Sequence, residues 1–212
     1  MSIVFRTALC STVLSLSLIT PALAQTQLIT SSEIKDLAVA LVRVKSEAEQ
    51  DQLLTHKDQL KNEALLSALK GMTDPLVRKG EYNEALRISH LAARIAEQMG
   101  DRMQLANAWY EVGAIYSRRQ PAKNGLSYLE KSLAIFEEAG AKKEQARVFL
   151  AMGAAENDRL RDLAVKCYEK ALALSEELGD RSLTARVFNG LGQTQSGLGN
   201  YDVGLEFYQK AR

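Results

Sequence analysis

Apolar residues recur at helical spacing along most of this chain, and one pattern returns roughly every forty residues. The stretches "ANAWYEVGAIY" (106–116), "ARVFLAMGAAE" (146–156) and "ARVFNGLGQTQ" (185–195) each place a ring, an aliphatic residue and a glycine in register. These positions are Trp109, Phe149 and Phe188, then Val112, Met152 and Leu191, then Gly113, Gly153 and Gly192. Residues three and four apart project to one side of a helix. Each stretch therefore predicts a helix with one apolar face.

A second helix is expected after each of these stretches. Glycines mark the turns and helix ends, at Gly80, Gly100, Gly140, Gly179 and Gly199. The second helices place a small residue four positions before Ser89, Leu129, Tyr168 and Tyr208. A glycine in the first helix lets the second approach closely, and that contact must offset about 1 kcal/mol of lost helix propensity. Since one pair cannot bury its own apolar face, the pattern predicts an all-α solenoid of antiparallel helix pairs.

The pattern divides the chain into a signal peptide (1–24), an irregular helical lead-in or cap (25–65) and repeats (66–212). The copies occupy about 66–105, 106–145, 146–184 and 185–212, and the last is incomplete. In the lead-in, Thr30 and Glu33 have the spacing of a capping box, which predicts a helix start. In the first copy, Thr73 replaces the close-approach glycine, and Pro75 predicts a kinked or broken helix.

The first 24 residues have the layout of a secretory signal peptide. A single cation, Arg6, precedes an apolar run over about 7–19, and a small-x-small site follows at Ala22–Ala24. The run is shorter than the roughly 20 residues that a spanning helix needs. We expect export to the periplasm or outside the cell, with cleavage after about Ala24. Cleavage would leave Cys167 as the one cysteine, without an internal disulfide.

The composition and the scattered reactive residues argue against several kinds of function. With 46% hydrophobic and 25% charged residues the chain is globular, and a net charge of +1 favours neither nucleic acid nor anionic membrane as a partner. His56 and His90 have no ligand cluster around them, and Cys167 has no neighbouring histidine. The glycine-rich stretch 190–199 lacks the third glycine of a dinucleotide loop and any Gly-Lys-Ser/Thr. We predict no metal, no cofactor and no catalysis.

The stretch "ARVFNGLGQTQSGLGNYDVGLEFYQKA" (185–211) resembles a tetratricopeptide repeat, from its ring and Leu-Gly to the aromatic residue and Lys-Ala of the second helix. The tyrosine expected late in the first helix is kept as Tyr116 but replaced by Glu156 and Gln195. The period is that of the roughly 40-residue variety in kinesin light chains. The resemblance covers about residues 66–212 and implies a right-handed superhelical solenoid. The layout also resembles the N-terminal part of bacterial secreted tetratricopeptide proteins, some of which carry a caspase-like CHAT protease domain.

The resemblance implies an exported protein–protein interaction module that binds peptide or protein partners on its concave face. Matching the repeats position by position places on this face Asn107, Tyr110, Ala114, Ser117 and Arg118, then Arg147, Leu150, Ala154, Asn157 and Asp158, then Arg186, Asn189, Gln193 and Ser196. The alternative for any one of them is an ordinary exposed helix residue. The set lacks the lysine-and-asparagine clamp of chaperone-binding members, so no peptide specificity follows.

Two further functions stay open from sequence. The chain could be the sensor or scaffold arm of a larger secreted enzyme, such as a caspase-like protease, truncated at Arg212. It could also be a structural protein that self-associates through its incomplete last copy. The last second helix stops early, and we expect Leu205, Tyr208 and Ala211 to be partly uncovered. This predicts a fragment, a truncated gene, or an end that docks onto another molecule.

Overall fold

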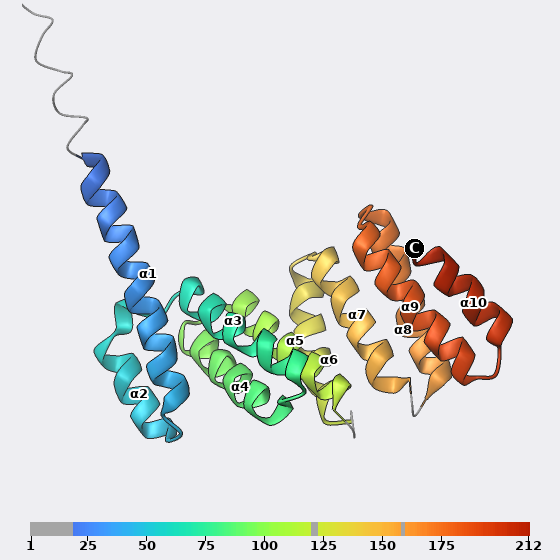
Figure 1. Cartoon of the computed structure of the whole chain (residues 1–212), viewed down its shortest axis with the longest axis horizontal. Coiled ribbons are helices and arrows are strands. Elements are labelled where there is room, and N and C mark those ends of the chain that lie inside the picture. The colour runs from blue at the N-terminus through green and yellow to red at the C-terminus, as the bar shows by residue number, and fades with distance from the viewer. Residues whose placement is uncertain (1–18, 120–122, 158–159) are drawn as a thin grey trace, which may run out of the picture. The chain divides into compact units, whose positions relative to one another are not determined.

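The computed structural model describes residues 19–119, 123–157 and 160–212, and every regular element in these ranges is helical (Figure 1). The chain divides into two compact units, Met1–Ala68 and Leu69–Arg212, with the boundary inside α3. The elements in chain order are α1 (Ile19–Arg43), α2 (Glu47–His56), the 3-10 helix η1 (Asp58–Leu60), α3 (Glu63–Lys79), α4 (Tyr82–Gln98), α5 (Arg102–Arg118), α6 (Lys123–Glu138), α7 (Lys142–Glu156), α8 (Arg161–Glu177), α9 (Arg181–Gly197) and α10 (Tyr201–Lys210).

The lead-in begins earlier than its sequence pattern predicts. Helix α1 starts at Ile19 and runs through Thr30, so the predicted helix start at that capping box is wrong. Residues 22–30 contain no glycine or proline, and nothing in the backbone stops the helix from extending toward its N-terminus. Residues 1–18, most of the predicted signal peptide, lie outside the described residues, and export stays a prediction.

A buried glutamine organises the first unit. The Gln50 side-chain amide donates hydrogen bonds to the carbonyl oxygens of Leu41, at 3.0 Å, and of Val44, at 2.8 Å. The last carbonyls of a helix have no partner within the helix. Gln50, on α2, therefore satisfies carbonyl groups where α1 ends and ties the two helices together.

The second unit consists of successive helix pairs, α3 with α4, α5 with α6, α7 with α8 and α9 with α10 (Figure 1). The second helix of each pair contacts the first helix of the next, since α4 contacts α5, α6 contacts α7 and α8 contacts α9. The first helices also contact one another, α5 with α7 and α7 with α9. The all-α solenoid of antiparallel helix pairs is thus confirmed.

The in-register glycines allow the two helices of a pair to approach closely, as predicted. A Cβ atom on Gly113 would lie 2.6 Å from Cγ of Leu129, on the partner helix. The equivalent glycines behave alike: a Cβ would lie 2.7 Å from the Tyr168 ring at Gly153 and 2.8 Å from the Tyr208 ring at Gly192. These distances are too short for any real Cβ. The glycine is therefore required by the bulky residue that faces it.

The first pair uses a different combination of sizes. Thr73 takes the glycine position, and Ser89 takes the position equivalent to Leu129; both are buried. The Thr73 hydroxyl donates to the carbonyl oxygen of Leu69 at 3.0 Å, so it is not left unsatisfied. A larger residue on one helix is accompanied by a smaller one on the other.

Helix α3 runs without interruption from Glu63 to Lys79, so the predicted break at Pro75 is wrong, while the alternative of a kink there stays a prediction. Leu76 and Val77, which directly follow the proline, pack against the buried cluster of Ala85, Leu86, Val112 and Ile115. This packing holds the last turn of α3 in place despite the backbone hydrogen bond that proline cannot make.

Among the described helices, none combines the length and the apolar character of a membrane span.

Candidate functional site

The predicted binding residues lie on the first helices of the pairs. We call this surface the first-helix face and define it by Lys70 on α3, by Asn107, Glu111, Ser117 and Arg118 on α5, by Arg147 on α7 and Asn157 directly after it, and by Arg186, Asn189 and Gln193 on α9. Because α5 contacts α7 and α7 contacts α9, residues at equivalent positions form a continuous surface across successive pairs. Asp158, also predicted here, lies outside the described residues.

A charged network joins three successive first helices. The Glu111 carboxylate accepts a hydrogen bond from Nζ of Lys70, and the same oxygen lies 3.6 Å from Nη2 of Arg147. Partly exposed ion pairs of this kind each contribute about 0–1 kcal/mol. Their main effect is therefore on geometry and charge, since one carboxylate holds two cations in place. The position-by-position prediction missed Glu111 and Lys70. The sequence did hold a signal for them, because the acidic Glu111 lies in the copy between those that carry the basic Lys70 and Arg147.

Two residues predicted to line the face are buried instead. Tyr110 lies beneath Arg147, whose guanidinium carbon is 4.4 Å from the centre of the tyrosine ring. Tyr110 and Leu150 each expose only 8% of their surface and belong to the hydrophobic clusters between helices. Their side chains support the face from below. The exposed contacts come from the polar residues around them.

The face is most open on α9. Arg186, Asn189 and Gln193 are all exposed and lie three and seven positions apart, hence on one side of the helix. Within the described residues, none of these three side chains has a hydrogen-bond or ion-pair partner. A guanidinium and two amides are therefore available to an external partner.

Other predicted residues are engaged in internal hydrogen bonds. The Ser117 hydroxyl donates to the carbonyl oxygen of Ala114 at 2.9 Å, within its own helix. The Thr194 hydroxyl on α9 donates to the side-chain oxygen of Asn157 at 2.6 Å, which joins α9 to the end of α7. Thr194 was not predicted, since a threonine in a glycine-rich stretch carries no signal for such a contact. These bonds fix the spacing of the helices that carry the face.

Lysines cover the rings that the sequence pattern places in register. The Nζ atoms of Lys131, Lys170 and Lys210 lie 5.5, 5.0 and 6.0 Å from the ring centres of Trp109, Phe149 and Phe188, respectively. An exposed cation–π contact contributes roughly 0.5–1 kcal/mol. The rings are only half-buried. In each of the last three pairs a lysine on the second helix therefore shields the ring on the first.

Cys167 and His90 are half-buried within the repeats. No group of three or more histidine, cysteine or acidic side chains in this part of the chain could hold a metal ion. Burial raises the pKa of the half-buried Cys167 thiol, so the reactive thiolate is disfavoured. Burial also lowers the pKa of His90, whose ring lies edge-on to Tyr128 with 5.5 Å between ring centres.

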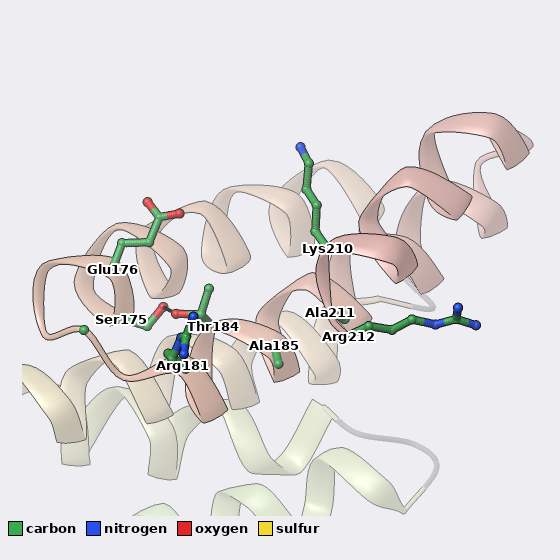
Figure 2. Close-up of a pocket in the computed structure, with 9 residues that line it drawn as sticks. Ser175, Glu176, Arg181, Thr184, Ala185, Lys210, Ala211 and Arg212 are labelled. Carbon is green, nitrogen blue, oxygen red and sulfur yellow. Dashed lines mark hydrogen bonds between the residues drawn. The ribbon is translucent and has the colours of Figure 1, made fainter.

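A hollow of about 610 Å³ lies between the ends of α8 and α10 and the start of α9 (Figure 2). Its lining includes Ala185, which is equivalent to Ala146 one pair earlier. One pair earlier, α8 continues past Lys170. Its residues Leu172 and Leu174 pack against the buried cluster that contains Ala146 and so fill this space. Helix α10 ends at Lys210, the equivalent of Lys170. The hollow thus follows from the length of α10, and we do not assign it as a ligand site.

Comparison with known proteins agrees with this architecture. Residues 144–212, which contain most of the last two helix pairs, match the tetratricopeptide repeat family. The crystal structure of BtubC (BKLC) from P. vanneervenii is similar in fold, with a TM-score of 0.58 and 19% sequence identity over 88% of this chain and 89% of that chain. No curated protein matches the chain. The chain therefore folds as an all-α solenoid of tetratricopeptide-like helix pairs, and its residues 144–212 match the tetratricopeptide repeat family.

Proposed function

We propose that this chain is an exported protein-binding module, which holds a peptide or partner protein on its first-helix face and catalyses no reaction. Tetratricopeptide repeats generally mediate protein–protein interaction, and all-helical folds of this type are typically non-catalytic. Helical solenoids present extended surfaces that suit such binding.

The observation that carries the proposal is the contrast between two parts of the first-helix face. On α3, α5 and α7 the charged groups of Lys70, Glu111 and Arg147 are connected to one another. On α9 the side chains of Arg186 and its neighbours are exposed without partners among the described residues. A rigid scaffold that carries exposed polar groups without internal partners can offer these groups to a bound chain.

Binding is tested by immobilising the purified chain and incubating it with proteins of the secreted or periplasmic fraction. One variant combines Arg186→Ala, Asn189→Ala and Gln193→Ala, and a control combines Lys166→Ala with Glu169→Ala on the exposed side of α8. We expect the parent and the control to retain a partner that the triple variant loses. A partner retained equally by all three chains would show that the first-helix face is not the binding surface.

Export is supported by the signal-like layout of the first 24 residues. The test is to express the full chain in a bacterium and measure its mass in the cytoplasmic and exported fractions. We expect an exported species that has lost the residues up to about Ala24. A full-length chain found in the cytoplasm alone would contradict this proposal.

We also propose self-association through the partly exposed apolar residues of α10. Leu205 and Tyr208 are 56% and 39% exposed, whereas Leu129 and Tyr168, equivalent to Tyr208, are at most 2% exposed because the following first helix covers them. Light scattering should show dimers or larger species for the parent and monomers for a Leu205→Ser, Tyr208→Ser variant. A monomeric parent would refute self-association. The arm of a larger secreted enzyme, such as a caspase-like protease, would instead place a further helix pair against these residues.

A further inference from the structure

Two arginines at the same repeat position have different surroundings. Arg147, on α7, lies over the Tyr110 ring of the preceding pair at 4.4 Å and 3.6 Å from the Glu111 carboxylate. Arg186, on α9, is the equivalent residue one pair later. The residues equivalent to Tyr110 and Glu111 are now Leu150 and Ala151. Arg186 therefore has neither the ring nor the carboxylate that holds and neutralises Arg147.

Nearby carboxylates do not replace Glu111. Glu177, the last residue of α8, pairs with Lys142, and Asp180, the N-cap of α9, lies 3.2 Å from Nζ of Lys143. Asp180 also accepts the backbone N–H of Leu183, and this hydrogen bond lowers the pKa of its carboxyl group. Both acids are committed to other groups. Within the described residues, Arg186 remains exposed and has no ion-pair partner.

The charges of the first-helix face are mainly positive. Among the described residues, the charged ones at these positions and at the equivalent positions of α3 are Lys70, Asp74, Arg78, Glu111, Arg118, Arg147 and Arg186, and Asp158 lies outside the described residues. Cations outnumber carboxylates, and Glu111 is already shared by two of the cations. The net field over this face therefore favours a negatively charged partner.

We propose that the first-helix face recognises an acidic segment of its protein partner, an inference that rests on the proposed binding function. A glutamate or aspartate of the partner takes the place beside Arg186 that Glu111 occupies beside Arg147. A guanidinium can bind such a carboxylate through two parallel N–H donors. Asn189 and Gln193, on the same side of α9, carry both donors and acceptors and pair with the partner's backbone amides.

A protein segment suits this surface better than a nucleic acid does. Amides and small side chains separate the cations of the face, and the whole chain carries a net charge of only +1. Nucleic-acid binding relies on several cations that neutralise consecutive phosphates. A single anchoring arginine followed by amide groups matches one carboxylate followed by a peptide backbone.

The test measures fluorescence anisotropy of three labelled peptides of equal length, rich in glutamate, glutamine or lysine, together with a labelled single-stranded oligonucleotide. The full chain is compared with Arg186→Gln and with Arg181→Gln. Arg181 is an exposed arginine on the same helix, five positions earlier and on another side, and its replacement changes the net charge equally. Circular dichroism verifies that all three chains are folded.

We expect the glutamate-rich peptide to bind most tightly and its affinity to fall with added salt. Arg186→Gln should weaken it about fivefold, the upper end for an exposed ion pair, and Arg181→Gln should have little effect. The glutamine- or lysine-rich peptide could instead bind as tightly as the glutamate-rich one, with an affinity that falls in an Asn189→Ala, Gln193→Ala variant. In that case the acidic preference is wrong while the binding function stands. If no peptide binds, both proposals fail. If the oligonucleotide binds more tightly than every peptide, the acidic-segment proposal is overturned.

Discussion

Replacing Gly113 with alanine tests whether close helix approach holds the pairs together. The added Cβ would lie 2.6 Å from Cγ and 2.7 Å from Cδ2 of Leu129, and 3.0 Å from the backbone oxygen of Gly125. Leu129 is fully buried, so its side chain has little room to move. The backbone oxygen can move only if α5 and α6 separate. The substitution should therefore push the two helices of this pair apart.

Two opposing effects set the magnitude. Forcing an extra methyl group into a well-packed core costs about 1–3 kcal/mol. Alanine gains about 1 kcal/mol over glycine in intrinsic helix propensity. Because the Gly113 contacts include a buried side chain and the backbone, the packing effect should exceed the propensity gain. Subtracting the propensity gain from the packing cost gives an expected net loss of up to about 2 kcal/mol in the free energy of unfolding.

The assay is urea denaturation followed by circular dichroism, with Gly71→Ala as the matched control. Gly71 is also inside a helix, but it is exposed and a Cβ there would have no atom within 4 Å. Gly71→Ala should therefore stabilise the chain by about 0.5–1 kcal/mol through propensity alone.

A Gly113→Ala variant that is stabilised as much as Gly71→Ala would refute the packing argument. A double-mutant cycle adds a second check, because Leu129→Ala removes the side chain that the new methyl group meets. The loss in the double variant should be smaller than the two single losses together. Strict additivity would mean that Gly113 and Leu129 do not oppose each other.

Three further predictions follow from single contacts. Burial lowers the pKa of His90, so the unfolded chain takes up the proton first as pH falls, and the free energy of unfolding should decrease below about pH 6.5. His90→Gln should reduce the difference between the urea midpoints measured at about pH 5 and at about pH 7.5. Ala141, the N-cap of α7, makes no side-chain cap, whereas the equivalent Asp101 does; Ala141→Asp should add about 0.5–1 kcal/mol, seen as a higher melting temperature. Glu111→Gln leaves Arg147 unneutralised and should raise the affinity for the glutamate-rich peptide; unchanged anisotropy titrations would contradict this role.

Much of the fold follows from the sequence, because the signals for it are local and periodic. The ring, aliphatic and glycine positions repeat on one helix face, and each glycine faces the bulky residue that requires it. Gly140 and Gly179 close α6 and α8 with φ of 64° and 63°, a region that favours glycine. Thr30 does not start a helix and Pro75 does not break one, because neighbouring residues and packing overrode these local signals.

The candidate site is less accessible to such reasoning. Repeat register identifies Arg147 and Arg186 as equivalent, and it places Tyr110 and Leu150 beside them. It does not show that Glu111 neutralises the first arginine, or that Tyr110 and Leu150 are buried. Each of these facts depends on side chains that meet from different helix pairs.

The amino-acid pattern thus establishes the helices, their pairing and the reason they stack, because each of these depends on the spacing of residues within one copy. The folded chain is needed to show which charges are satisfied and which are exposed. Equivalent residues are separated by roughly forty positions in the chain, yet the partner of a given side chain is chosen by distances of a few ångströms in space. Arg147 and Arg186 share a position in the repeat. The preceding first helix pairs Arg147 with Tyr110 and Glu111, whereas it leaves Arg186 exposed to an external partner.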